Sequence, residues 1–199
     1  MHPTLTIGHS NLSYEAFRDL LELAGVTAIA DVRTTPFSRY HPWFNGARLA
    51  EALKADGVAY VPMGEQLGGR PADPSLFRDG VADYEAMARV PAFVAGVERV
   101  LAGAAEHRIA LMCSEGDPTE CHRCLLVGRA LHARGQVVQH LHKDGSFLTQ
   151  EGIEDKLVGW LRPKGIGLFD EAPSLDDAYA ARARKIAFGA KGVTRPAGA

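Results

Sequence analysis

Short apolar runs alternate with segments of helical periodicity along the first 162 residues. After Leu5-Thr6-Ile7, apolar positions recur three and four residues apart from Tyr14 to Ala24, and Ser13, a good helix-capping residue type, precedes them. Residues 26–32 are then almost continuously apolar, which is typical of a parallel strand buried on both faces. This stretch predicts a β-α-β unit with a right-handed crossover.

The same alternation continues through the chain. It predicts helices over 47–56, 84–105 (with a second helix starting at Pro91), 125–133 and 153–161, and strands over 58–61, 108–112 and 137–141. Strands that alternate with helices predict an α/β fold, with a mostly parallel sheet and helices on both faces. We expect one domain over residues 1–162, and a C-terminal extension over 163–199 with a helix at 176–188 and a frayed end.

Polar or glycine-rich residues follow four of the predicted strands. In a parallel sheet the carboxyl ends of the strands meet at one edge, and ligands bind outside that edge. We therefore expect one site there. It would collect Gly8, His9 and Ser10, then Asp31 and Arg33, then the Gly-rich segment with Gly68 and Gly69, and finally Cys113 with the residues that follow it.

The densest polar segment runs from Cys113 to Arg123, from a strand end to the start of a helix. The free N–H groups at a helix start stabilise a thiolate, a phosphate or a carboxylate. Cys121 or Cys113 is a candidate nucleophile, His122 an acid-base partner and Glu115 a base. The alternative is that Cys113 is a small core residue, and that His122 and Arg123 only hold the loop in place.

The three cysteines permit two further interpretations. Cys121 and Cys124 form a C-x-x-C pair at a helix start, as in redox motifs. Together with Cys113 and His122 they would also supply four zinc ligands, but no second ligand pair supports zinc. We therefore expect no metal and no other cofactor. An odd number of cysteines in one segment also predicts reduced thiols and a cytoplasmic location.

Anion binding is the second chemical theme. Asp31 in a buried strand needs a partner, and Arg33 or Arg123 would provide a bidentate one. Either this pair is structural, or Asp31 orients Arg33 as an anion clamp, with Arg123 as a second clamp. Further cations that would add positive charge to the same cleft are Arg39, Arg48 and Arg70.

Two loops offer weaker signals. Gly8-His9-Ser10 precedes a helix, so its N–H groups would cradle an anion beside His9 as an acid-base group, unless His9 is structural. Gly68 and Gly69 alone do not define a phosphate loop. The aromatic residues of the loop 34–46 would either form a lid that stacks on a flat ligand or pack the loop on the core; they are Tyr40, Trp43 and Phe44.

Composition limits the partners. The net charge is −2, which does not favour nucleic-acid binding, although a local positive pocket for a small anionic ligand is compatible with it. No apolar run of about 18 residues is present, so we expect no membrane span, and the start of the chain does not resemble a signal peptide. Oligomeric state cannot be read from these features.

The motifs, in order, resemble the bacterial family called domain of unknown function 488. The resemblance covers roughly residues 4 to 160 and rests on Gly8-His9-Ser10, Asp31-Val32-Arg33 with Pro36 and Ser38-Arg39, Leu67-Gly68-Gly69, and Cys113, Glu115, Pro118 and Cys121-His122-Arg123. What it implies for activity is only that the family is uncharacterised. Cys124 is not part of the family pattern.

The chain is also faintly similar to rhodanese-like sulfurtransferases, which have Asp-x-Arg at a strand end and later a strand ending in a catalytic cysteine. That similarity would make Cys113 a persulfide carrier. The short cysteine loop of those proteins closes with an arginine six residues after the cysteine, where this chain has Thr119.

Three functions follow from these observations. The first is an enzyme acting on a phosphate-bearing or nucleotide-like ligand, with Arg33 and Arg123 as clamps and with Cys121, His122, Glu115 and His9 as reacting groups. The second is a non-catalytic ligand-binding or regulatory module with the same pocket. The third is sulfur transfer or redox chemistry through Cys113 or Cys121.

Overall fold

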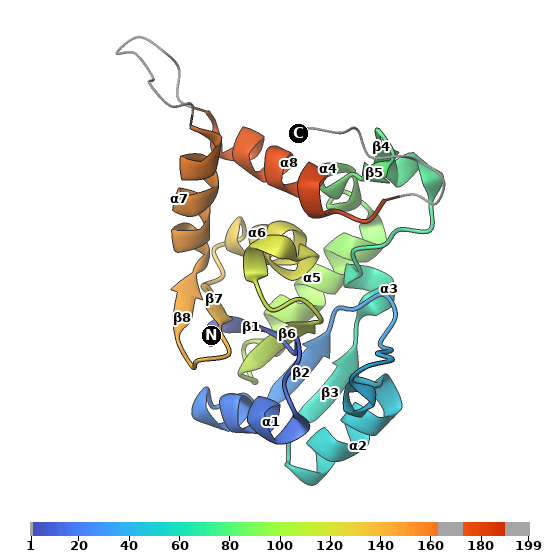
Figure 1. Ribbon diagram of the computed structural model, residues 1–199, viewed down its shortest axis with the longest axis vertical. Helices are drawn as coiled ribbons and strands as arrows, with labels where there is room; N and C mark the ends of the chain where they lie inside the picture. Colours follow the sequence, from blue (N-terminus) through green and yellow to red (C-terminus); the bar gives the residue numbers. More distant parts are fainter. Residues whose placement is uncertain (1, 163–172, 190–199) are drawn as a thin grey trace.

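Six strands form one sheet in the order β3-β2-β6-β1-β7-β8 in the computed structural model, which describes residues 2–162 and 173–189 (Figure 1). All neighbouring strands are parallel except β7 and β8. The predicted α/β fold with a mostly parallel sheet is therefore confirmed. The strands are β1 (Thr4–Gly8), β2 (Ala28–Asp31), β3 (Ala59–Pro62), β6 (Ile109–Cys113), β7 (Val138–Leu141) and β8 (Phe147–Thr149).

The register places the carboxyl ends of the central strands level with one another. Gly8 at the end of β1 pairs with Cys113 at the end of β6, and Asp31 at the end of β2 pairs with Met112. The segments that follow these three strands therefore leave the sheet at the same edge, where sequence analysis places the site.

Helices cover both faces of the sheet, as predicted. Successive residues of β6 face opposite sides of the sheet: Leu111 packs into one core and Met112 into the other. Figure 1 shows α1 and α2 on one side of the sheet, and α5, α6 and α7 on the other. These helices are α1 (Tyr14–Leu23), α2 (Gly46–Ala55), α5 (Pro91–Gly103), α6 (Arg129–His132) and α7 (Gln150–Leu161).

The first helix shows why the sequence pattern was informative. The Ser13 side chain accepts a hydrogen bond from the Ala16 N–H at 3.2 Å, which caps α1. Phe17 and Leu21 on its inner face are at most 1% exposed. The helix ends before Gly25, whose φ of +63° is a left-handed conformation that glycine adopts without strain.

Several segments differ from the prediction, and α7 begins at Gln150, not at 153. The helix after Cys121 begins at Arg123, not at 125, as a π-helical turn η4 (Arg123–Gly128) that leads into α6. The short edge strand β8 was not predicted, because three residues are too few to show a period of two. It pairs antiparallel with β7 after the turn at Asp144-Gly145, where Gly145 has φ +83°.

The connections hold several short elements that periodicity does not reveal. Residues 84–105 form two helices, and the second begins at Pro91 as predicted. The short elements are η1 (Pro42–Phe44), α3 (Gly64–Leu67), η2 (Pro74–Leu76), β4 (Phe77–Arg78), β5 (Val81–Ala82), α4 (Tyr84–Met87) and η3 (Pro118–Glu120).

The last described helix, α8 (Leu175–Ile186), runs from beside the end of α7 toward α4 and lies above α6 in Figure 1. Tyr179 is 1% exposed and its hydroxyl donates to Glu154 of α7 at 2.9 Å. Arg182 Nε donates to the Thr119 carbonyl at 2.8 Å. The predicted helical part of the extension is thus present, whereas the expected frayed end, 190–199, lies outside the described residues.

Within the described segments, no helix combines the length and the apolar character needed to cross a bilayer.

Candidate functional site

A cavity of about 290 Å³ opens where β2 and β6 end. Its walls come from the segment after β2, the segment from Cys113 to His122, the Gly69-Arg70 turn and the chain around Phe188. The polar side chains that line it include Arg33, Thr34, Arg70, Glu115, Glu120 and His122, together with the thiols of Cys113 and Cys121. The cavity therefore suits a small polar molecule.

Two buried thiols share one carboxylate at the wall of this cavity. The Sγ atoms of Cys113 and Cys121 each donate to Glu115 Oε2 at 3.0 Å. Cys113 and Cys121 are 3% and 1% exposed, whereas Glu115 is exposed as a residue and places only its carboxylate against the sulfurs. With His122 these residues form one group, called the thiol cluster below.

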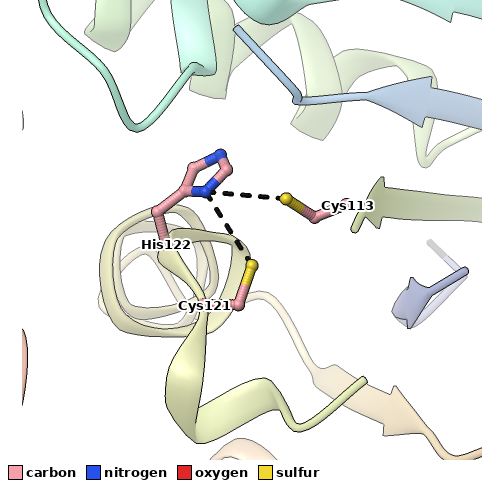
Figure 2. A group of neighbouring side chains, drawn as sticks. All are labelled: Cys113, Cys121 and His122. Atoms are coloured by element: carbon pink, nitrogen blue, oxygen red, sulfur yellow. Dashed lines mark hydrogen bonds between the residues drawn. The ribbon is translucent and has the colours of Figure 1, made fainter. Parts of the chain in front are cut away.

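His122 faces both sulfurs with a single nitrogen. Its Nε2 lies 2.9 Å from the Val32 carbonyl oxygen, an acceptor, so we assign the ring hydrogen to Nε2. Nδ1 then presents its lone pair to Cys113 Sγ at 3.7 Å and to Cys121 Sγ at 3.8 Å, as Figure 2 shows. The ring is thus oriented to accept a proton from a thiol or to bind a metal ion.

The electrostatics separate the two thiols. Burial disfavours the thiolate of Cys121, but the Cys113 thiol, Arg123 and His122 outweigh burial and hold the pKa of Cys121 well below its usual value. The hydrogen bond with Cys121, together with burial, raises the pKa of Cys113 well above its usual value. Cys121 is therefore the thiol that ionises first.

The neighbours of the Cys121 sulfur respond to its charge. Burial and the negative sulfur of Cys121 raise the pKa of Glu115. Burial opposes protonation of His122, but the Cys121 sulfur outweighs it and raises the pKa of His122. The cluster thus holds an acidic thiol beside two groups able to carry protons, which is the arrangement of thiol catalysts.

Arg123 is fully buried and donates to the protein itself. Its Nη1 donates to the Glu115 carbonyl at 2.5 Å, its Nη2 to the Gly116 carbonyl at 3.0 Å and its Nε to Thr6 Oγ1 at 3.3 Å. Arg123 is absent from the cavity lining, so its contacts support the interpretation that it holds the loop in place.

Arg33 and Asp31 form the bidentate pair that the sequence suggested. Nε and Nη2 of Arg33 donate to the two carboxylate oxygens at 2.8 and 2.5 Å, and Nη2 also donates to the Phe44 carbonyl. Tyr60 donates to the same carboxylate at 2.7 Å. Arg33 is 4% exposed and reaches the cavity wall, but Asp31 neutralises its charge, so the structural interpretation of this pair is supported.

The Gly8-His9-Ser10 turn is occupied by backbone contacts. The N–H groups of His9 and Ser10 donate to the carbonyls of Cys113 and Ser114 at 3.0 and 2.9 Å. His9 stacks on Phe44 with ring centroids 4.3 Å apart, and its Nε2 lies 3.4 Å from Arg33 Nη1. Burial and Arg33 lower the pKa of His9 to about 4. The turn therefore holds the backbone of Cys113 and Ser114 in place and does not line the cavity.

Of the remaining predicted residues, some line the cavity and others do not. Gly69 lines it, whereas Gly68 packs against Thr34 behind it. Arg39 lies beside Tyr40, which is 80% exposed, and neither lines the cavity. Cys124 is fully buried with its sulfur 3.8 Å from Gln150 Nε2, so the structure does not bring it to the thiol cluster.

Sequence reasoning missed the groups that support the site from other elements. These groups are Tyr60 on β3, His140 on β7 and Gln150 on α7. The signal that could have identified them is a polar residue in or beside a predicted apolar segment, because a buried polar group needs a partner. No local pattern indicates that residues 186–189 reach the cavity, because that contact depends on the path of the chain after α7.

Gly69 is a sensitive position for the site. A Cβ added there would lie 2.6 Å from Cγ of His122, a contact that carbon atoms do not tolerate. Gly69→Ala is expected to displace the imidazole and to cost about 1–3 kcal/mol of stability. Urea denaturation and the titration of His122 followed by NMR test this, with Gly159→Ala as the control, because a Cβ there meets open space. An unchanged His122 titration would contradict the packing described.

Comparison with known proteins gives one family match. The model described as "Domain of unknown function DUF488" matches residues 13–130. That range spans Asp31 to Arg123 and so includes the thiol cluster, whereas the Gly8-His9-Ser10 turn, α7 and α8 lie outside it. No curated protein and no solved structure matches the chain.

Proposed function

Because this chain belongs to the DUF488 family, whose description gives no activity, we propose a function from the site itself: a cysteine-dependent enzyme acting on a small anionic molecule. The observation that carries the proposal is the thiol cluster, in which two sulfurs, one imidazole nitrogen and one carboxylate meet at the wall of a polar cavity. Cys121 would be the nucleophile, with His122 and Glu115 moving protons.

An anionic substrate group is supported by Arg70. Its guanidinium lies 5.2 Å from the centre of the Phe188 ring at the cavity wall, and the residue is exposed. No carboxylate of the described residues is within ion-pair distance of Arg70. We therefore propose Arg70 as the group that meets a phosphate or carboxylate of the substrate, while Arg123 holds the loop.

The first test of the proposal is alkylation of the native protein with iodoacetamide in the presence of a chelator, followed by peptide mass spectrometry. We expect modification of Cys121 or Cys113, because both line the cavity, and none of Cys124, which does not. A phosphate compound that fits the cavity, drawn from a set of nucleotides and phosphosugars, is expected to slow the modification.

Matched variants sharpen this test. Arg70→Ala should abolish protection by the phosphate compound, whereas Arg99→Ala, at an exposed position of α5 outside the cavity lining, should keep it. Glu115→Gln should abolish turnover of the protecting compound, and binding without turnover in the wild type would favour the non-catalytic module. Modification of all three cysteines only at the rate of unfolding would refute the proposal.

Redox chemistry is the second candidate, because the Cys113 and Cys121 sulfurs lie within 4.8 Å of each other. A mild disulfide oxidant would then remove two hydrogen atoms from the chain, and a mass loss of that size would be confined to the peptides containing these two residues. For either candidate we propose a reducing, cytoplasmic setting, which agrees with three free cysteines.

A further inference from the structure

We propose that the reduced thiol cluster binds one thiophilic divalent cation, such as Zn²⁺, through Cys113, Cys121, His122 and Glu115. The sequence alone led us to expect no metal, because no second ligand pair supported the four ligands that Cys113, Cys121, His122 and Cys124 would supply. The inference rests on the proposed function in one respect: it gives that same thiol site a metal-dependent form of regulation.

The donor atoms are already close to the spacing of a metal site. Among the described residues, Cys113, Cys121 and His122 form a group whose ligand atoms all lie within 4.8 Å of one another. The nitrogen–sulfur separations are 3.7 and 3.8 Å. With Zn–S near 2.3 Å and Zn–N near 2.0–2.1 Å, a tetrahedral site separates sulfur and nitrogen by about 3.6 Å. The two nitrogen–sulfur pairs would therefore need shifts of only about a few tenths of an ångström to admit the ion.

His122 is oriented as metal-binding histidines are. Its Nε2 donates to the Val32 carbonyl, which fixes the tautomer and leaves the Nδ1 lone pair directed at the sulfurs (Figure 2). Gly69 packs against the ring and limits its rotation. The imidazole would thus bind an ion without a rotamer change.

Glu115 supplies the fourth ligand. Its Oε2 is 3.0 Å from both sulfurs, and Glu115 lines the cavity as both cysteines do. On binding, the two S–H groups would release two protons to solvent, and the two thiolates and the Glu115 carboxylate would exceed the divalent charge by one negative charge. The Arg123 N–H, which lies 3.4 Å from Cys121 Sγ, would donate to one of these thiolates.

Metal binding and thiol chemistry exclude each other at this site. A sulfur that coordinates the ion has its reactive lone pair engaged, and the ion would stand between Cys121 and the cavity. Zn²⁺ would therefore block the enzyme proposed above, and removal of the ion would restore it.

The test is a titration of the reduced, chelator-treated full chain with Zn²⁺ against a chromophoric zinc indicator. We expect one ion per chain. Cys113→Ser, Cys121→Ser and His122→Gln should each weaken binding by more than the roughly 10–100-fold that loss of a supporting partner costs. Cys124→Ser, the matched control, should bind as the wild type does. With Co²⁺, the wild type should show the thiolate charge-transfer band and the intense visible bands of a tetrahedral site.

A second measurement keeps this inference separable from the proposed function. Alkylation of the wild type in chelator reports thiol reactivity without metal, and added Zn²⁺ should suppress it. Alkylation without any zinc binding would overturn the metal inference alone. Zinc binding without alkylation in chelator would overturn the cysteine-dependent enzyme and leave the metal site standing. Zinc binding that Cys113→Ser and His122→Gln leave unchanged would also overturn the inference.

Discussion

Replacing Arg123 with methionine is expected to lower the free energy of unfolding by about 3–5 kcal/mol. The guanidinium is fully buried and donates to two loop carbonyls and to Thr6. Methionine fills much of the same volume but donates nothing, so the carbonyls of Glu115 and Gly116 would lose their partner. Urea denaturation at neutral pH measures the loss.

Two further variants decide what Arg123 contributes. Arg99→Met makes the same chemical change at an exposed position of α5 and should change stability by no more than about 0.5 kcal/mol. Arg123→Lys keeps the charge but cannot serve two carbonyls and a hydroxyl with one planar fork, so it should rescue only part of the loss. A loss below about 1 kcal/mol in Arg123→Met would show that the loop does not depend on this residue.

The role of Arg123 marks the limit of what the sequence could predict about the site. Apolar runs predicted β1, β2 and β6, and the polar residues at their ends predicted where the cavity lies. Whether a buried arginine binds a ligand or the backbone depends on the loop it meets, and no spacing rule states that. Gly8 shows the same limit, because an added Cβ would lie 1.7 Å from the Glu115 carbonyl oxygen. Only the folded loop reveals that this position requires glycine.

The cysteines illustrate the same limit. The C-x-x-C spacing paired Cys121 with Cys124, but the chain after Cys121 winds as a π-helical turn and directs Cys124 toward Gln150. The partner of Cys121 is Cys113, at the end of β6. The loop between β6 and η4 brings the two cysteines together, and Glu115 within it accepts from both sulfurs. The path of this loop belongs to the tertiary structure and cannot be read from residue spacing.

A buried chain of hydrogen bonds runs from Arg123 away from the cavity. Arg123 donates to Thr6 Oγ1, and the neutral His140 ring carries its hydrogen on Nε2, which faces the acceptor Gln150 Oε1, so the Thr6 hydroxyl donates to His140 Nδ1 at 2.8 Å. His140 Nε2 then donates to Gln150 Oε1 at 2.9 Å, and Gln150 Nε2 donates to the Tyr179 hydroxyl at 2.6 Å. In this order His140 Nδ1 is an acceptor, so a second proton on the ring would meet the hydrogen of the Thr6 hydroxyl.

Acidification from pH 7 to pH 5 is therefore expected to destabilise the chain through His140 and His9. Burial, and then Arg123, lower the pKa of His140 from 6.5 to about 4, and burial and Arg33 do the same for His9. The unfolded chain binds more protons than the folded chain between these two values, so stability is complete above about pH 6.5 and falls toward pH 4. Each residue should contribute a loss of about 2 kcal/mol over the interval from pH 7 to pH 5.

Variants isolate this contribution from that of every other titrating group. His140→Gln keeps a donor toward Gln150 but cannot ionise, so its own loss of stability from pH 7 to pH 5 should be about 2 kcal/mol smaller than that of the wild type. The exposed His107→Gln should show the full wild-type loss. Denaturant titrations at the two pH values measure the difference. If His140→Gln lost as much stability as the wild type, His140 would already carry its proton in the folded chain, and Thr6 Oγ1 would accept from His140 Nδ1 instead of donating to it.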